Sequence, residues 1–271
     1  MTMTEEQTVR YSRQILLEGV GRVGQEKLLS SRVLLIGAGG LGAPLALYLV
    51  AAGVGTLGIA DSERLDLSNL QRQVLFTTDD IGRPKAEAAR AKLKRLNPDV
   101  EIEIHSERVT AENVMTTIRD YHFIVDATDN LSTKFLINDA CVLSARPFSH
   151  GGLLRFEGQA MTYVPGAACY RCIHGSPPPK AAVPSSSEVG VLGAVAGMLG
   201  SIQAAEALKY LLGIGDLLTN RVLTLNALTM EQRMVRTKRN LHCAVCGSHR
   251  SIRSPGERGQ VGRRWPDTRS T

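Results

Sequence analysis

Three glycines and an aspartate form the first pattern in this sequence that could do chemistry. Gly37, Gly39 and Gly42 follow the apolar run 33–36 with the G-x-G-x-x-G spacing of a nucleotide-binding turn. The first glycine permits the bend, the second lets backbone N–H groups approach a phosphate, and the third lets the next helix pack closely. Asp61 ends the next apolar run, where its carboxylate can accept hydrogen bonds from ribose hydroxyls. The pattern predicts a nucleotide site, the alternative being a glycine turn that only joins a strand to a helix.

Four of the five cysteines form a second pattern, two C-x-x-C pairs far apart in the chain. The pairs are Cys169 with Cys172 and Cys243 with Cys246. Two such pairs are typical of a structural zinc ion held by four thiolates, and they would clamp distant segments together. A redox dithiol and reduced cysteines without a role are the alternatives, and His174 and His242 lie close enough to compete as ligands. The fifth, Cys141, falls in a predicted helix and is interpreted as a small buried apolar residue.

Strands and helices that alternate along the first half of the chain would position the glycine turn. Apolar runs predict strands over 33–36, 56–60, 100–104 and 122–126, and helices are predicted over 43–52, 85–96, 111–119 and 131–145. This alternation predicts an α/β fold with a doubly wound, mostly parallel, Rossmann-like sheet. The polar stretch after Asp61 follows a strand, where open α/β sheets bind ligands.

From Pro147 the pattern changes to antiparallel strands. We expect a strand, a turn at 156–159 and a second strand within 148–164, then further strands at 221–226 and 230–236. A loop rich in Pro and Ser is predicted over 176–187, a helix of small residues over 190–212, and an N-terminal helical stretch over 5–30.

Charge is unevenly distributed along the 271 residues, whose net charge is +6. Residues 248–271 carry six arginines against Glu257 and Asp267, so they account for +4 of this charge. We therefore predict one continuous domain over 1–247 and a basic, disordered tail over 248–271. A weak contact of this tail with nucleic acid is the less favoured alternative. The polar N-terminus is unlike a signal peptide and no apolar run is long enough for a membrane span, so a cytoplasmic location is expected.

The order of several short motifs resembles one family. The motifs are Arg10-Tyr11-Ser12-Arg13-Gln14, the glycine turn, Asp61, Ser68-Asn69-Leu70-Gln71-Arg72-Gln73, Lys85, Asp126-Ala127-Thr128-Asp129-Asn130 and the paired C-x-x-C. Each is weak alone, but in this order they closely resemble the ThiF/MoeB/HesA family, bacterial relatives of ubiquitin-activating enzymes. The resemblance covers residues 10–247.

This resemblance implies an enzyme that adenylates the C-terminal Gly-Gly carboxylate of a small ubiquitin-like sulfur-carrier protein and releases pyrophosphate. ATP and Mg²⁺ are the implied cofactors beside zinc, and a homodimer and an external sulfur donor are the implied partners. The family pattern places the nucleotide at Gly40, Asp61, Asn69, Arg72, Lys85, Asp129 and Asn130, with Ser68, Leu70 and Gln71 in the same motif. It implies that Arg72 and Lys85 hold the phosphates, Asp61 the ribose and Asp129 the metal. Arg13 would reach the triphosphate from the other subunit.

One departure concerns a thiol that many relatives carry in the loop before Gly190-Val191. This chain has Ser186 there, and a serine hydroxyl is a poor substitute for a thiolate. The sequence therefore favours an adenylate held without a covalent enzyme–carrier bond. Three other functions remain as alternatives: adenylation of a peptide or natural-product precursor, an NAD-dependent oxidoreductase, and a scaffold that binds a carrier without activating it.

Overall fold

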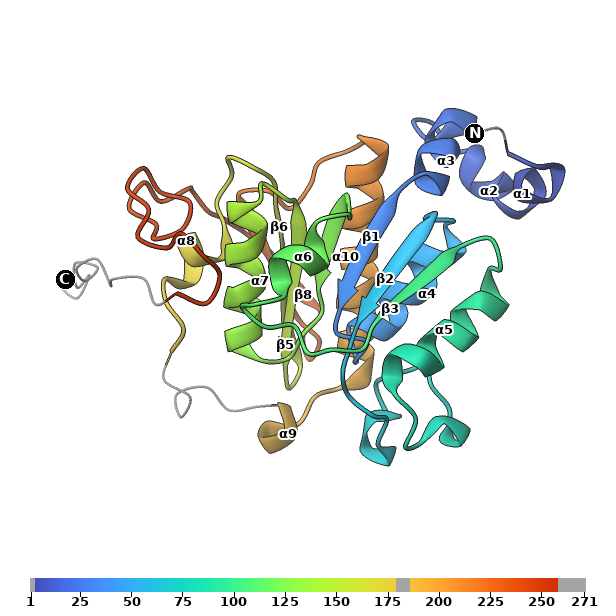
Figure 1. The fold of residues 1–271 in the computed structure, drawn as a ribbon, viewed down its shortest axis with the longest axis horizontal. Helices are drawn as coiled ribbons and strands as arrows, with labels where there is room; N and C mark the ends of the chain where they lie inside the picture. Colours follow the sequence, from blue (N-terminus) through green and yellow to red (C-terminus); the bar gives the residue numbers. More distant parts are fainter. Residues whose placement is uncertain (1–2, 179–185, 258–271) are drawn as a thin grey trace.

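One eight-stranded sheet lies at the centre of the computed structural model, which describes residues 3–178 and 186–257 (Figure 1). Its strands are β1 Arg32–Ile36, β2 Thr56–Ala60, β3 Glu101–His105, β4 Phe123–Asp126, β5 Phe148–Leu154, β6 Glu157–Tyr163, β7 Arg221–Asn226 and β8 Glu231–Arg236. They lie in the order β3-β2-β1-β4-β5-β6-β7-β8. All pairs from β3 to β5 are parallel and all pairs from β5 to β8 are antiparallel. The predicted Rossmann-like sheet that continues into antiparallel strands is confirmed.

Helices cover both faces of the sheet. The described α-helices of the chain are α1 Glu5–Arg10, α2 Ser12–Ile15, α3 Gly21–Leu29, α4 Gly42–Ala51, α5 Lys85–Leu96, α6 Val114–Ile118, α7 Leu131–Leu143, α8 Tyr170–His174, α9 Ser186–Val189 and α10 Gly193–Leu212. Side chains alternate along a strand, so Val33 and Leu35 join the core with α4, α5 and α10. Leu34 and Ile36 join the opposite core with α6 and α7. Burial on both faces explains why these strands read as continuous apolar runs.

The N-terminal region differs from the single helical stretch expected over 5–30. Three separate helices form instead, because Gly19 before α3 and Gly21 at its first position have φ values of +85° and +58°, which end a continuous helix. Val20 and Leu28 then pack against Leu212 at the end of α10.

The hairpin between β5 and β6 also differs from the prediction, because its turn lies at Arg155 and Phe156 and not at 156–159. Gly158, which suggested the turn, lies inside β6. A Cβ atom at this position would collide with Leu199 of α10. Gly158 therefore permits close packing of a helix on the sheet, whereas Arg155 supplies the positive φ of 55° that the turn needs.

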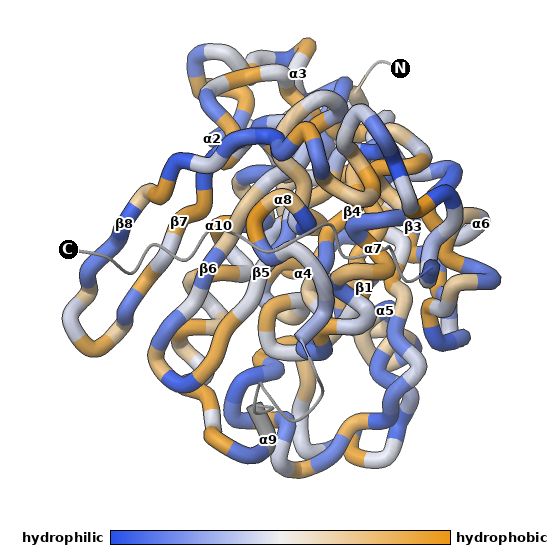
Figure 2. Tube along the Cα trace, turned by 90° about the vertical axis from the view of Figure 1, so that its left-hand side faces the viewer, coloured by the Kyte–Doolittle hydropathy of each residue, from blue (hydrophilic) through white to orange (hydrophobic). Residues whose placement is uncertain are grey.

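The far edge of the sheet is β8, whose six residues are all exposed. Figure 2 shows the β7–β8 hairpin projecting from the body of the protein, with hydrophilic and hydrophobic residues mixed along it. No helix within the described residues is long and apolar enough to cross a membrane.

The described chain continues past the predicted domain boundary at residue 247. Ile252 is fully buried, and the N–H groups of Ser251 and Ile252 donate to the carbonyl of Ala244. Residues 258–271 of the predicted tail and 179–185 of the predicted loop lie outside the described residues. Ser186 begins α9, at the end of that predicted loop.

We predict opposite effects for two glycines of α10. A Cβ at Gly200 would collide with the carbonyl of Leu41 and lie 2.7 Å from Pro44 Cγ, whereas at Gly197 it would meet no described atom within 4 Å. Gly200→Ala should lower the free energy of unfolding by about 1–3 kcal/mol through overpacking against α4. Gly197→Ala should raise it by up to about 1 kcal/mol, since alanine favours a helix. Urea unfolding checks both variants, and equal effects would contradict the packing described for α10.

Candidate nucleotide site and metal centre

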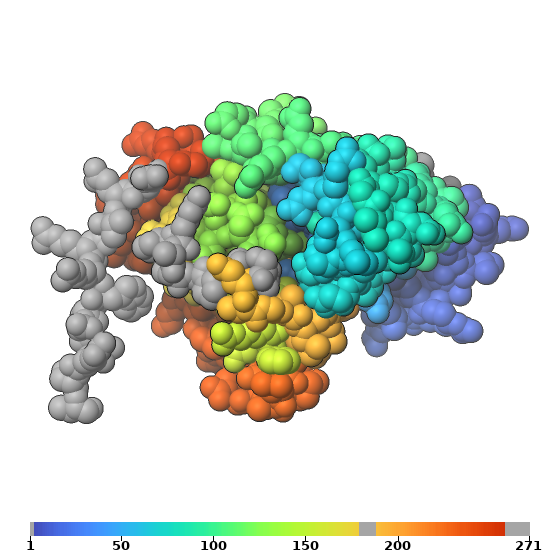
Figure 3. Space-filling view, turned by 90° about the horizontal axis from the view of Figure 1, so that it is seen from below, coloured from blue at the N-terminus to red at the C-terminus, as the bar shows by residue number. Residues whose placement is uncertain are grey.

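A cavity of about 950 Å³ opens where the parallel strands β1, β2 and β4 end. Its described lining includes most of the predicted nucleotide residues: Gly37, Gly39, Gly40, Asp61, Asn69, Arg72, Lys85, Asp129 and Asn130. Residues of β5, β6 and β7 continue the lining beyond the glycine turn. Figure 3 looks onto this side of the molecule, with the loop after β2 in light blue to cyan and the β5–β6 hairpin in yellow-green. Strand ends and loops from both halves of the sheet therefore share one cavity.

Two glycines of the glycine turn have different surroundings, one packed against the protein and the other open to the cavity. Gly37 has a φ of +95°, and a Cβ there would lie 2.8 Å from the carbonyl oxygen of Ala127. At Gly39 the nearest described atom to such a Cβ is Gln73 Nε2, at an uncrowded 3.6 Å. Packing thus explains the glycine at 37 but not at 39. The open space above Gly39 suits the close approach of a ligand to the backbone.

Asp61 is fixed at the cavity wall by two backbone hydrogen bonds. The Ala38 N–H donates to Oδ2 at 2.8 Å and the Glu63 N–H donates to Oδ1 at 2.9 Å. Burial raises the pKa of Asp61, and these two hydrogen bonds and the charge of Lys85 oppose that shift. The carboxylate therefore joins the glycine turn to the loop after β2 and presents its remaining lone pairs to the cavity.

Two cations of the site come from the loop after β2 and the start of α5. Arg72 Nη1 donates to the carbonyl of Ser68 at 2.9 Å, and the Arg72 side chain runs beside Gly40. Lys85 is 3% exposed and its Nζ lies 2.6 Å from Glu63 Oε2. The Glu63 side chain is 70% exposed, so the pair joins a buried ammonium group to a carboxylate at the protein surface.

The remaining predicted residues divide between the cavity and its surroundings. Asp129 and Asn130 line it, and Asn130 caps α7 by accepting a hydrogen bond from the Thr133 N–H at 2.8 Å. Four predicted residues are not among its described lining: Arg13, Ser68, Leu70 and Gln71. Ser68 belongs to the short 3₁₀ helix η1, Leu67–Asn69, and Leu70 packs against the core, so both shape the loop that carries Arg72. Arg13 is exposed on α2.

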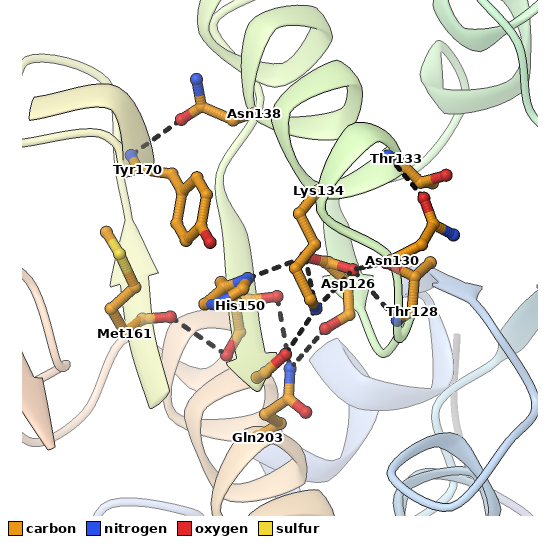
Figure 4. A network of polar contacts seen from close by, with 12 residues as sticks. Asp126, Thr128, Asn130, Thr133, Lys134, Asn138, His150, Met161, Tyr170 and Gln203 are labelled. Atoms are coloured by element: carbon orange, nitrogen blue, oxygen red, sulfur yellow. Dashed lines mark hydrogen bonds and ion pairs between the residues drawn. The ribbon is translucent and has the colours of Figure 1, made fainter. Parts of the chain in front are cut away.

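A buried polar network beside the cavity was missed by the sequence analysis (Figure 4). Asp126 ends β4 with no exposure, and Lys134 Nζ lies 3.4 Å from its Oδ2. His150 of β5 donates from Nδ1 to the same oxygen at 2.8 Å, and Thr128 donates to Oδ1 at 2.7 Å. Burial opposes ionisation of Asp126, but the Lys134 charge and the His150 hydrogen bond lower its pKa to about 2. Burial and the nearby Lys134 charge lower the pKa of His150 to about 4, so its imidazole is neutral at pH 7.

The four paired cysteines meet in one cluster. All four sulfur atoms lie within 4.8 Å of one another, and four of the separations are 3.8, 3.7, 3.5 and 3.3 Å. Thiolates at about 2.3 Å from a tetrahedral zinc ion would be about 3.8 Å apart. The backbone N–H of Asn240 also donates to Cys172 Sγ at 3.3 Å. The donor set therefore fits a metal site, and among the described residues neither His174 nor His242 belongs to it.

The four-cysteine cluster is joined to the cavity through α8. Arg171 lies between Cys169 and Cys172, and its guanidinium pairs with both carboxylate oxygens of Asp139 in α7 at 2.6 and 2.7 Å. The neighbouring Tyr170 lines the cavity, and its ring lies 4.4 Å from the His150 ring between centroids. Cys141 is fully buried in α7, as predicted.

With this geometry established, comparison with known proteins decides the family. A model described as the ThiF family matches residues 11–245. The chain belongs to the ThiF family. A sulfur carrier protein adenylyltransferase of Thermus thermophilus is 46% identical over 253 residues, covering 91% of this chain and 93% of that protein. A SAMP-activating enzyme E1 of Haloferax volcanii is 45% identical over 247 residues, covering 91% and 92%.

Solved structures with the ThiF-family fold resemble this chain in architecture. MccB of E. coli superposes with a TM-score of 0.79 at 20% identity, covering 92% of this chain and 75% of that one. PaaA superposes with a TM-score of 0.72 at 24% identity, covering 89% and 76%. At this identity the likeness concerns the fold.

The neutral state of His150 predicts a pH dependence of stability. A histidine of the unfolded chain has a pKa of about 6.5, whereas that of His150 in the folded protein is about 4. The contribution of the neutral His150 to the free energy of unfolding is therefore complete above about pH 6.5 and is lost as the pH falls toward 4. Between about pH 7.5 and 5 the loss should be about 2 kcal/mol. Urea unfolding at both pH values gives the loss in free energy of unfolding for the wild type and for His150→Phe. The wild type should lose more than the variant by this amount, whereas equal losses would contradict the assignment.

Proposed function

We propose that this ThiF-family protein is an adenylyltransferase that uses ATP to activate the C-terminal Gly-Gly carboxylate of a small ubiquitin-like sulfur-carrier protein. The observation that carries the proposal is the gathering of the glycine turn, Asp61, Arg72 and Lys85 in one cavity. The relatives from Thermus and Haloferax, whose names describe this kind of activity, match nearly their whole length. An NAD-dependent oxidoreductase would give no role to the two cations.

The proposed reaction needs charge compensation more than acid–base catalysis. The carrier carboxylate is already ionised at pH 7, so it attacks the α-phosphorus of ATP directly and pyrophosphate leaves. Arg72 and Lys85 would bind the phosphates and stabilise the charge that develops on the leaving group. Asp61 would bind the ribose hydroxyls and thereby orient the nucleotide. Asp129 would hold Mg²⁺, which when bound offsets phosphate charge.

A homodimer belongs to the same proposal. Arg13 is exposed on α2, outside the cavity of its own chain, which suits a side chain that reaches the triphosphate of a second subunit. The cytoplasmic location, the external sulfur donor and the noncovalent adenylate that Ser186 favours also stay predictions.

We assign zinc to the four-cysteine cluster because the sulfur separations match a tetrahedral thiolate site. Cys169, Cys172, Cys243 and Cys246 fill all four positions, so the metal would be structural. It would join α8 to the segment after β8, which lies about 70 residues later in the chain.

The phosphate-binding role predicts the effect of removing either cation. Lys85→Ala or Arg72→Ala should reduce the exchange of labelled pyrophosphate into ATP by about a hundredfold or more, the scale of one lost transition-state contact. Lys94→Ala is a matched control, because Lys94 also lies on α5 but forms a surface ion pair with Glu101. Near-normal exchange in the Lys85 and Arg72 variants would refute the site assignment, and a large loss in the Lys94 variant would show that the effect is not specific.

The zinc assignment predicts metal content and stability. Purified protein should contain about one zinc per chain, and Cys243→Ala should lose the metal and melt at lower temperature, because metal-binding energy is part of folding energy. Cys141→Ala is the control, since this cysteine is buried in α7 outside the cluster and its variant should keep the zinc. Elemental analysis and thermal unfolding measure both effects. Metal-free wild-type protein with the same melting temperature would reject the assignment.

A further inference from the structure

The loop that follows β3 lies beside the proposed ribose site. The backbone N–H of Asp61 donates to the carbonyl of His105, the last residue of β3, at 3.2 Å. The loop therefore begins next to Asp61, and its residues Glu107, Arg108 and Val109 line the cavity. In a nucleotide the base is attached to the ribose carbon next to the one that carries the 2′-hydroxyl. A ribose whose hydroxyls bind the Asp61 carboxylate thus brings its base close to this strand end.

The cavity has an apolar wall on the face of the sheet opposite the phosphate-binding residues. This apolar wall consists of Ile36, Ala60, Val109 and Leu131, all of which line the cavity. The first three belong to the core with α6 and α7, and Leu131 begins α7. The glycine turn and Lys85 instead lead into α4 and α5, which pack on the other face. Because the base and the 5′-phosphates leave the ribose from opposite ends of its ring, phosphates beside Lys85 direct the base toward the apolar wall.

Arg108 brings an unpaired guanidinium to this part of the cavity. Its side chain is exposed and forms no hydrogen bond or ion pair with another described residue. Its backbone is held in place, because its carbonyl accepts a hydrogen bond from Asn113 Nδ2 at 2.9 Å. Oδ1 of the same asparagine accepts one from the Thr110 N–H at 2.8 Å. Asn113 thus fixes the loop and leaves the guanidinium free, and a guanidinium plane stacks readily on the face of an aromatic ring.

We propose that the guanidinium of Arg108 stacks on the base of ATP and holds it against the apolar wall. This inference rests on the proposed nucleotide site and makes no assumption about the carrier protein. A purine offers two fused rings to the guanidinium and a pyrimidine offers one, so the stack favours ATP over UTP. Arg108 is thereby a specificity residue for the nucleotide. A lone positive charge near the phosphates would attract both nucleotides equally.

The test compares ligands that differ in their base. Isothermal titration calorimetry with Mg²⁺ and without carrier gives the Kd of ATP, UTP and inorganic tripolyphosphate. In Arg108→Ala the binding of ATP should weaken about 5- to 30-fold, the scale of one cation–π contact with a base, and that of UTP by a smaller factor. Tripolyphosphate, which has no base, should change by less than about twofold. Arg95→Ala is the matched control, since Arg95 is also exposed but lies near the end of α5, outside the described cavity lining, and its variant should bind all three ligands like the wild type.

A second variant separates stacking from charge. Arg108→Tyr removes the positive charge but keeps a ring that can stack, so it should bind ATP more tightly than Arg108→Ala and retain the preference over UTP. Equal ATP affinities of these two variants would overturn the proposal, as would unchanged ATP binding in Arg108→Ala. An equal loss for ATP and tripolyphosphate would also overturn it, because the guanidinium would then act on the phosphates. Absence of ATP binding by the wild type would instead reject the nucleotide site itself.

Discussion

The buried charge of Asp126 is the constraint on which the site depends. A carboxylate without solvent at the end of β4 stays ionised only if cations and donors surround it. Lys134 of α7, His150 of β5 and Thr128 of the next turn supply them. Gln203 of α10 also donates to the Asp126 backbone carbonyl at 3.0 Å. Satisfying the carboxylate and the backbone carbonyl of Asp126 therefore fixes two helices and two strands around the cavity, next to the point where the sheet changes from parallel to antiparallel.

The four-cysteine cluster extends this constraint to the segment after β8. Its two cysteine pairs lie on α8 and on the segment after β8, which are distant in sequence. The Arg171 ion pair with Asp139 binds the first pair to α7, the helix that also supplies Lys134. Tyr170 of the same helix, α8, packs its ring against the His150 ring. A structural metal held there would act on the cavity through packed side chains, although it lies outside the cavity lining.

The parts of the site that lie in short local motifs could be predicted from the sequence. The residues that are brought together only by the pairing of strands and the packing of helices were missed. The glycine turn, Asp61 and the two C-x-x-C pairs each occupy a short segment, so their spacing alone indicates the chemistry. Lys134 and His150 meet Asp126 only through the phase of α7 and the register of β5 with β4. Nothing in the sequence distinguishes such a lysine from a solvated one. Gly158 misled for a related reason, because its role in packing against α10 is set by a distant helix.

The charge pattern across the sheet suits a reaction between two anions. Arg72 and Lys85 lie toward the β2 side of the glycine turn, where the proposed phosphates would bind. On the β5 side an uncompensated Asp126 would repel an arriving carboxylate, since such repulsion is strong in a poorly solvated site. Lys134 offsets that charge from within the protein, and His150 stays neutral because burial and the Lys134 charge lower its pKa. In the proposed reaction Arg72 and Lys85 would then attract the carboxylate toward the α-phosphorus, because Lys134 offsets the charge of Asp126.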